Sequence, residues 1–297
     1  MAYYNQDTIV WLDGQFHKAG EVQADLYGQT LHYGYGAFEG IRSYDTAKGA
    51  RIFKAKEHYE RLRRSCELLA IPFPWDIDAL TETTYALLEK NNLRDAYIRP
   101  LVYCDPNMTL IRPKGVHIFM AVWDWGAYLG EKLLRITLSP FCRPHPKSTF
   151  VEAKACGHYI NSILAGNEAR DRGFDEALLL DCDGFLAEGP GANLFFEKAG
   201  VLYTPQLGNI LPGVTRATVI ELCQDIDIPV EEGLYPPETL MEADSAFFCG
   251  TGAEIVGIKQ LDNYTFPKPW AESLGASLRE AYLNLVREKP YLMVDVD

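Results

Sequence analysis

The sequence has few positive charges and no long apolar run, and both absences exclude classes of protein. Lys and Arg number 28 against 41 Asp and Glu, which leaves a formal net charge of −13. Nucleic acids and anionic membrane surfaces select basic patches, so neither is expected as the main partner. No apolar run approaches the roughly 20 residues that span a bilayer. The first residues also lack the basic and apolar regions of a signal peptide, so we expect a cytoplasmic protein.

Paired cysteines and clustered metal ligands are also missing. The seven cysteines are scattered and include no CxxC. This pattern is typical of reduced thiols rather than a disulfide framework. None of the six histidines is paired at metal-ligand spacing with another His or Cys. We therefore expect neither structural disulfides nor a metal site.

The chain has the length and the apolar content of an α/β protein of two domains. It contains 297 residues, 47% of them hydrophobic, which is ample for a sizeable core. We expect a domain over 1–125, a glycine-bearing connector over 126–132 and a second domain over 133–297. Helical and alternating patterns predict strands within 8–16, 96–104, 116–123, 133–140 and 176–181, and helices within 54–69, 78–92, 158–173, 215–226 and 267–289.

One lysine lies among small residues in VEAKACGHYIN, residues 151–161. Ala153 and Ala155 flank Lys154, and Cys156 and Gly157 follow it. An ordinary surface lysine at the end of a strand would fit this stretch. The alternative is a lysine with open room beside it, which holds a ligand.

Two turns offer free backbone N–H groups to an anion. In LPGVTRATVIEL a Pro-Gly pair precedes a helix, so the N–H groups of Val214 and Thr215 would lie at its positive end. An ordinary turn with Thr215 as the N-cap is the alternative. In CGTGAEI the residue Thr251 lies in a glycine turn, which could also bind an anion. The alternative is an ordinary turn between a strand and a helix that needs glycine for its backbone conformation.

A carboxylate and a guanidinium stand out among apolar residues. Glu188 precedes a tight Gly-Pro-Gly turn. It is either an acid that the turn holds rigidly or a solvated glutamate at the end of a strand. In AYIRPLVY the period of two places Arg99 on one face with Tyr97 and Tyr103. Arg99 is then either paired internally or faces a cavity that admits a carboxylate. A lysine for a Schiff base, an acid for a pyridinium nitrogen and a helix N-terminus for a phosphate together suit pyridoxal phosphate.

Eight ordered motifs resemble the branched-chain aminotransferases, a group of fold-type-IV pyridoxal-phosphate enzymes. They are LHYGYGAFEGIR, EHYERL, AYIRPL, WGAYLG, EAKACGHYINS, AEGPGANLF, LPGVTR and GTGAEI. The resemblance implies a small N-terminal α/β domain, a larger C-terminal domain and the cofactor between them. It further implies a homodimer or a dimer-based hexamer, in which the loop over 104–115 of one subunit caps the pocket of its neighbour.

The resemblance also implies roles for individual residues. The cofactor residues would be the Schiff-base lysine Lys154, Tyr159 at the phenolic oxygen, Glu188 at the pyridine nitrogen, and Arg61, Val214, Thr215 and Thr251 at the phosphate. The substrate residues would be Tyr33, Phe38, Tyr97, Arg99, Trp125, Tyr128, Thr251 and Gly252. Among these, Arg99 would pair with the side-chain carboxylate of glutamate and be masked by tyrosine hydroxyls when an aliphatic substrate is bound.

The implied reaction transfers the amino group between L-leucine, L-isoleucine or L-valine and 2-oxoglutarate. Related fold-type-IV enzymes share the lysine, the acid and the phosphate turns, so aminodeoxychorismate lyase and D-amino-acid or (R)-amine transaminases remain alternatives. The chain departs from the common family pattern at Tyr35, Cys156, His158 and Ala192. These departures affect the expected substrate preference but remove no expected cofactor contact.

Overall fold

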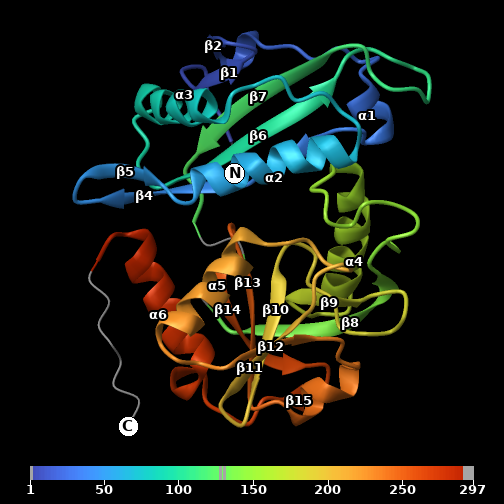
Figure 1. Ribbon diagram of the computed structural model, residues 1–297, viewed down its shortest axis with the longest axis vertical. Helices are drawn as coiled ribbons and strands as arrows, with labels where there is room; N and C mark the ends of the chain where they lie inside the picture. Colours follow the sequence, from blue (N-terminus) through green and yellow to red (C-terminus); the bar gives the residue numbers. More distant parts are fainter. Residues whose placement is uncertain (1–2, 127–128, 130–131, 290–297) are drawn as a thin grey trace. The chain divides into compact units, whose positions relative to one another are not determined.

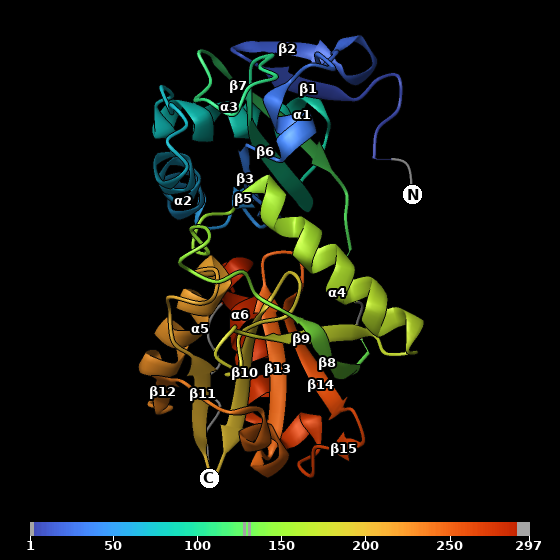
Figure 2. The same cartoon turned by 90° about the vertical axis from the view of Figure 1, so that its right-hand side faces the viewer.

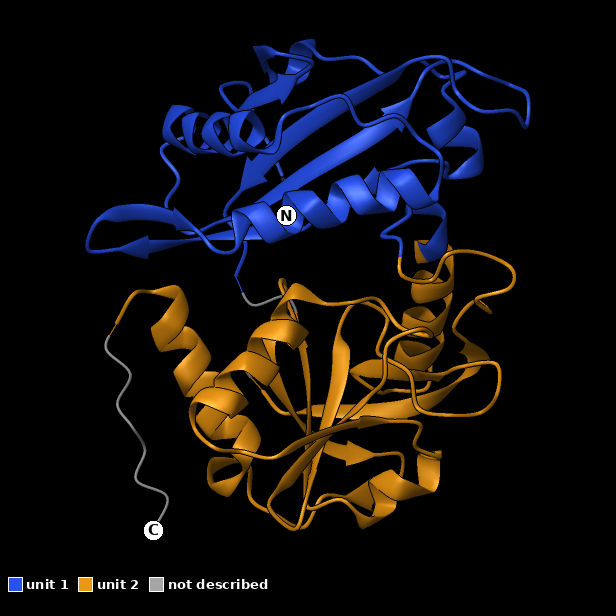
Figure 3. Cartoon of the chain, viewed as in Figure 1, with its two compact units in different colours: residues 1–126, 153–158 blue, residues 127–152, 159–297 orange. Residues whose placement is uncertain are grey.

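The computed structural model describes residues 3–126, 129 and 132–289. The chain forms two compact units, which Figure 3 colours separately: residues 1–126 with 153–158, and residues 127–152 with 159–297. The segment that carries Lys154 thus belongs to unit 1, although the expected boundaries had placed it in the second domain. Tyr128 and most of the expected connector lie outside the described residues.

Unit 1 is built on one antiparallel sheet. Its strands are β1 (Ile9–Leu12), β2 (Gln15–Lys18), β3 (Ala37–Phe38), β4 (Ile41–Thr46), β5 (Gly49–Ile52), β6 (Ala96–Cys104) and β7 (Val116–Trp123). The order is β2-β1-β7-β6-β4-β5, with β3 paired to β6. Its helices are α1 (Gln29–Tyr33), α2 (Ala55–Leu68) and α3 (Ile77–Lys90), and two short 3-10 turns cover Ala19–Glu21 and Cys156–His158.

Alternation in the two longest strands of unit 1 separates a core face from a site face. The core face carries Ile98 and Val102 of β6 and Met120 of β7, all buried against α2 and α3, and Figure 1 shows these helices beside the two strands. The opposite face carries Tyr97 and Arg99, as the period of two predicts. The sheet therefore presents one polar and aromatic surface away from its own core.

Unit 2 is built on a mixed sheet. Its strands are β8 (Leu134–Cys142), β9 (Glu176–Leu180), β10 (Asn193–Lys198), β11 (Val201–Pro205), β12 (Val230–Gly233), β13 (Ser245–Gly250), β14 (Glu254–Leu261) and β15 (Tyr264–Thr265). The order is β12-β11-β10-β13-β14-β8-β9, with β15 paired to β14. The pairs β8–β9, β8–β14 and β11–β12 are parallel and the others antiparallel.

Three helices pack on the sheet of unit 2, namely α4 (Tyr159–Asp171), α5 (Val214–Asp225) and α6 (Leu274–Val286). Helix α4 contacts β8 and β9, whereas α5 contacts β13, and α6 contacts β13 and β14 (Figure 2). Short 3-10 turns cover Pro237–Glu242 and Trp270–Glu272. The two units together give a mixed α/β architecture, which confirms the expected fold class.

Several local predictions need correction. The last helix begins only at Leu274, because Ser273 caps it and accepts the Ala276 N–H, while the proline-bearing stretch before it forms a 3-10 turn. The turn at 251–253 joins β13 to β14, so it connects two strands and not a strand to a helix. The N-cap of α5 is Gly213, not Thr215. Within the described residues, no helix is both long enough and apolar enough to cross a membrane.

Candidate active site

The Lys154 segment is fixed to unit 1 through its backbone. The N–H of Lys154 donates to Oγ of Ser65 on α2 at 3.0 Å, and its carbonyl accepts the N–H of Phe38 at 3.1 Å. The flanking Ala153 and Ala155 are buried, and Ala155 pairs with the strand β3. Lys154 itself is half-buried, and its Nζ lies 5.2 Å from the centre of the Phe38 ring. The small side chains therefore allow this segment to pack closely against β3 and α2.

A buried ion-pair cluster, which sequence analysis missed, holds Arg61. Its guanidinium donates to both oxygens of Glu39, from Nε at 2.7 Å and from the terminal nitrogen at 2.9 Å. His58, one turn earlier on α2, places its Nδ1 2.8 Å from Glu39 Oε2. The Arg61 guanidinium is thus oriented by a carboxylate that comes from the FEGIR motif.

The titration of this cluster follows from its burial and its charges. Burial raises the pKa of Glu39. The charge of Arg61 and the hydrogen bond from His58 together outweigh this effect, so the pKa of Glu39 lies far below the usual range. Burial is also the main reason that the pKa of His58 is lowered, with smaller contributions from the charges of Arg61 and Lys154. His58 is therefore neutral and donates its Nδ1 proton to the ionised Glu39.

Arg99 lies among aromatic rings on the site face of unit 1. Its guanidinium carbon is 4.7 Å from the ring centre of Phe38, 5.3 Å from that of Tyr97 and 5.9 Å from that of Trp123. A terminal nitrogen donates to the Tyr97 hydroxyl at 3.2 Å. Its Nε is buried and has no hydrogen-bond acceptor among the described residues. Of the two readings of Arg99, these contacts favour a guanidinium that is masked by rings and open to a further acceptor.

Tryptophans extend this aromatic cluster. Trp125 packs edge-on against Tyr97 at 4.6 Å between ring centres, and Trp123, which sequence analysis did not select, lies 5.1 Å from Tyr97. Arg42 fixes this end of the unit by donating to the backbone oxygens of Trp125 and Gly126. A side chain at Gly40 would overlap the Tyr97 hydroxyl, which explains the glycine in FEGIR.

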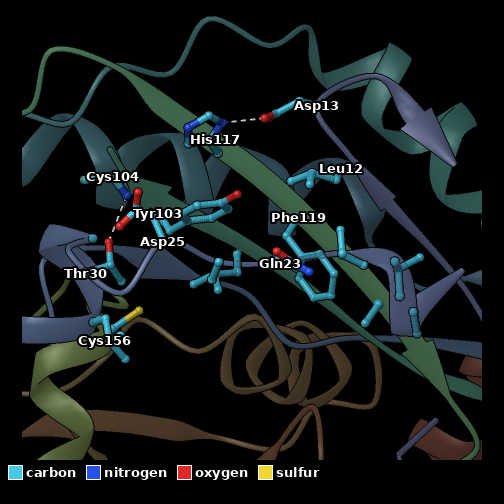
Figure 4. Close-up of a pocket in the computed structure, with 18 of the residues that line it drawn as sticks. Leu12, Asp13, Gln23, Asp25, Thr30, Tyr103, Cys104, His117, Phe119 and Cys156 are labelled. Carbon is cyan, nitrogen blue, oxygen red and sulfur yellow. Dashed lines mark hydrogen bonds and ion pairs between the residues drawn. The ribbon is translucent and has the colours of Figure 1, made fainter. Parts of the chain in front are cut away.

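An apolar pocket of about 920 Å³ adjoins the same face of the sheet (Figure 4). Leu101, Tyr103 and Phe119 line it, and Asp13 and His117 lie at one side with an ion pair between them. Tyr33 does not line this pocket. It is exposed on α1, and its hydroxyl donates to the backbone oxygen of Met108 in the 104–115 loop at 3.2 Å.

Glu188 in unit 2 is buried and held by several donors, so the reading as a solvated strand end is wrong. Its oxygens accept from the side-chain amide of Asn193 at 3.0 Å and the backbone N–H of Leu211 at 3.2 Å. Arg143 Nε forms an ion pair with Oε1 at 2.9 Å, although its N–H does not point along the contact. Donors and a cation of this kind favour the ionised carboxylate. Neither Arg143 nor Asn193 was singled out from sequence.

The two predicted anion turns of unit 2 lie close to Glu188. Asn193, which holds Glu188, also occupies the space that a side chain at Gly213 would need. The first-turn N–H groups of α5, at Val214 and Thr215, have no acceptor within the helix. The strand pairing of β10 with β13 brings the 251–253 turn to the same edge, since Gly250 lies against the turn before Asn193. Thr251 and Gly252 are half-buried there.

The remaining expected residues and departures take simple positions. Tyr159 is the first residue of α4 and is half-buried. His158 Nδ1 lies 3.1 Å from the backbone oxygen of Ala153, a structural contact. Burial raises the pKa of the Cys156 thiol to about 11, and Tyr35 reaches the backbone of Leu69 through its hydroxyl.

Comparison with known proteins assigns the chain to a family. The model of the family described as amino-transferase class IV matches residues 36–261, well over half of the chain. The chain therefore belongs to the class IV aminotransferases.

Full-length relatives narrow the class to the branched-chain enzymes. The branched-chain-amino-acid aminotransferase of Pseudomonas aeruginosa is 37% identical over 295 residues, which cover 97% of this chain and 96% of that protein. The solved branched-chain aminotransferase of Thermoproteus uzoniensis with norvaline has a TM-score of 0.91 at 35% identity and covers 97% of each chain. That of Thermobaculum terrenum, solved in its PLP form, has a TM-score of 0.90 at 29% identity and covers 96% of this chain and 95% of that one. The resemblance and the fold-type-IV architecture are thus confirmed.

Proposed function

We propose that the protein transfers the amino group between L-leucine, L-isoleucine or L-valine and 2-oxoglutarate, with pyridoxal 5'-phosphate as its cofactor. One observation carries the substrate assignment. The ring of Phe38 has the Lys154 amine at 5.2 Å and the Arg99 guanidinium at 4.7 Å from its centre. A reactive amine and a carboxylate-binding group therefore share one aromatic wall, as an enzyme for both aliphatic and acidic amino acids requires.

The residues present fit the cofactor. Glu188 has a donor set that favours its charged form, which is what a protonated pyridine nitrogen needs beside it. The first turn of α5, whose N–H groups at Val214 and Thr215 have no acceptor within the helix, suits a phosphate. We assign the phosphate to Arg61, Val214, Thr215 and Thr251, the ring nitrogen to Glu188, and the phenolic oxygen to Tyr159. When bound, pyridoxal phosphate supplies the electron sink that makes the α-proton of an amino acid acidic.

The chain's own residues then have distinct tasks. The Lys154 amine binds the cofactor and moves the proton at the α-carbon, since hydrogen bonds fix its backbone through both the N–H and the carbonyl while the residue remains half-buried. Tyr97 orients the α-carboxylate, and Phe38 and Trp125 exclude water from the aliphatic side chain. Arg99 binds the second carboxylate of glutamate through the nitrogen that has no acceptor among the described residues.

We further propose a cytoplasmic homodimer, either alone or as the unit of a hexamer. The apolar pocket beside the site face and the exposed Leu110 and Ile111 of the 104–115 loop support this, because exposed apolar groups of this size mark contact surfaces. Tyr33, whose hydroxyl contacts that loop, and the neighbouring Met108 would reach the site of the second copy.

A donor and acceptor panel on the purified holoenzyme tests the assignment. We expect L-leucine, L-isoleucine and L-valine to be turned over with 2-oxoglutarate, and borohydride to attach the cofactor to a peptide that contains Lys154. Lys154→Ala should abolish turnover, whereas Lys132→Ala, at a lysine that is 74% exposed, should retain it. Preferential use of a D-amino acid, or conversion of aminodeoxychorismate, would replace the proposed function by one of the alternatives.

A further inference from the structure

Two cysteines of unit 2 lie against each other although they are 40 residues apart in sequence. Their sulfurs, Cys142 Sγ and Cys182 Sγ, are 3.3 Å apart. The parallel pairing of β8 with β9 explains this, because Cys142 is the register partner of Leu180 and Cys182 lies two residues further on. The Arg143 N–H, which donates to the Leu180 carbonyl at 2.8 Å, fixes the two chain segments at this point.

Accessibility separates this pair from the other five cysteines. Cys142 and Cys182 are both exposed, whereas the remaining cysteines are buried or half-buried. Burial also makes those thiols poor nucleophiles, since it raises the pKa of Cys66 and Cys223 to about 12. An oxidant in solution therefore reaches one adjacent pair of thiols in the described chain.

We propose that Cys142 and Cys182 form a reversible dithiol–disulfide site that is oxidised by hydrogen peroxide. In the first step one thiol loses its proton, and its thiolate sulfur attacks a peroxide oxygen. An S–O bond forms and the O–O bond breaks, so that the cysteine becomes a sulfenic acid, and the departing hydroxide takes up the released proton as water. The second thiol then attacks this sulfur, the S–S bond forms, and a second water is released. The two sulfurs lose two electrons in total and the peroxide oxygens gain them; a small dithiol reverses the reaction.

The geometry favours the second step over the competing reactions of a lone sulfenic acid. The resolving thiol lies at 3.3 Å, and a disulfide needs an S–S distance near 2.05 Å, which rotation of two exposed side chains supplies. The hydrogen bond with Cys142 favours the protonated thiol and is the main reason that the pKa of Cys182 is raised. The rate of oxidation should therefore rise with pH through the alkaline range.

The bond would act on the backbone that holds Arg143. Cys142 is the preceding residue, and the Cys182 thiol donates to the Arg143 carbonyl at 3.3 Å. The carbonyl of Cys142 in turn accepts from Asn161 at the start of α4 at 2.9 Å. The Arg143 guanidinium pairs with Glu188, so the oxidised site lies one residue from a group that supports the proposed cofactor acid.

The test counts thiols and maps the bond, so it does not depend on transamination. The reduced holoenzyme is treated with hydrogen peroxide at mildly alkaline pH, its free thiols are alkylated, and it is digested with trypsin. We expect the loss of two of the seven thiols. A cross-link should join peptides 136–147 and 173–198, with a mass lower by two hydrogen atoms, and dithiothreitol should remove it.

Matched variants decide the assignment. Cys142→Ser and Cys182→Ser should each prevent the cross-link, and the double variant should lose thiols at least tenfold more slowly than the parent. Cys156→Ser, which keeps the pair, should still form the bond. A bond between two subunits, oxidation of the two cysteines to separate sulfinic acids, or equal thiol loss in the double variant would overturn the proposal. Each of these results would leave the proposed aminotransferase function as it stands.

Discussion

Replacing Arg99 by leucine should separate the two halves of the proposed reaction. The guanidinium lies over Phe38 and Tyr97 and donates to the Tyr97 hydroxyl, and its buried Nε has no acceptor among the described residues. Glutamate brings a side-chain carboxylate that fills this vacant acceptor position. Leucine brings only methyl groups, which contact the rings. The variant therefore removes an interaction that one substrate uses and the other does not.

The magnitude follows from the contact that is lost. Removing one partner of a buried, hydrogen-bonded charge pair costs about 2–5 kcal/mol. At about 1.4 kcal/mol per factor of ten, this predicts a loss of about 30-fold to several-thousand-fold in kcat/KM for L-glutamate. For L-leucine the new side chain replaces aliphatic and ring contacts at about 0.8 kcal/mol per buried methylene, so the change should stay within a few-fold. Arg99→Lys keeps the charge without the planar fork and should give an intermediate loss for glutamate.

Single-turnover absorbance measurements of the two half-reactions provide the assay. Each substrate is mixed with the holoenzyme, and the loss of the aldehyde form of the cofactor is followed at several concentrations. Equal losses for glutamate and leucine would show that Arg99 is a structural residue and would refute the dual recognition. A parallel thermal-unfolding measurement distinguishes lost recognition from a damaged fold.

Two further predictions concern buried and bridging charges. Glu39→Gln should lower the free energy of unfolding of the apoprotein by about 3–5 kcal/mol, because Arg61 is left buried without its carboxylate. Urea unfolding measures this loss, and pyridoxal phosphate should restore part of the lost stability. An equal loss with and without the cofactor would contradict the assignment of Arg61 to the phosphate. Burial lowers the pKa of His117, but its hydrogen bonds to Asp13 and Asp105 raise it more, so its folded pKa lies above the unfolded value near 6.5. The stabilisation by protonated His117 is complete below the unfolded pKa and is lost as pH rises through the folded pKa. His117→Asn should therefore destabilise the protein in acid more than at pH 9. A pH-independent loss of stability would rule out a charged His117 between Asp13 and Asp105.

The sequence predicted those parts of the fold and site that depend on local pattern. The strict alternation of AYIRPLVYC correctly assigned Arg99 and Tyr97 to one face of β6. Helices α2, α3, α4 and α5 also lie within a few residues of their predicted ranges. Short strands such as β3 and β4 were missed, because most of their residues are buried and no alternation marks them.

Contacts between distant residues explain what the sequence did not predict about the site. Glu39 and Arg61 are 22 residues apart and come from a loop and a helix, so no spacing rule connects them. Arg143 lies on the β8 side of the sheet of unit 2 and reaches Glu188 only through the pairing of strands. The signal that was available was the acid within FEGIR, because a glutamate between an aromatic residue and a glycine that precedes an apolar residue is unusual unless it is buried with a cation.

The pairing of arginines with protein carboxylates distinguishes the residue that can bind the side-chain carboxylate of a substrate. Arg61, which we assign to the cofactor phosphate, and Arg143 are each already paired, with Glu39 and Glu188, so a substrate carboxylate gains less charge neutralisation from either of them. Arg99 has no carboxylate partner among the described residues, and its charge is masked by rings and one hydroxyl. Cation–π contacts of this kind contribute about 0.5–2 kcal/mol, which is enough to tolerate the charge beside an aliphatic substrate and less than a carboxylate offers. The same guanidinium can therefore remain in place for leucine and still favour glutamate, without any movement of the sheet that carries it.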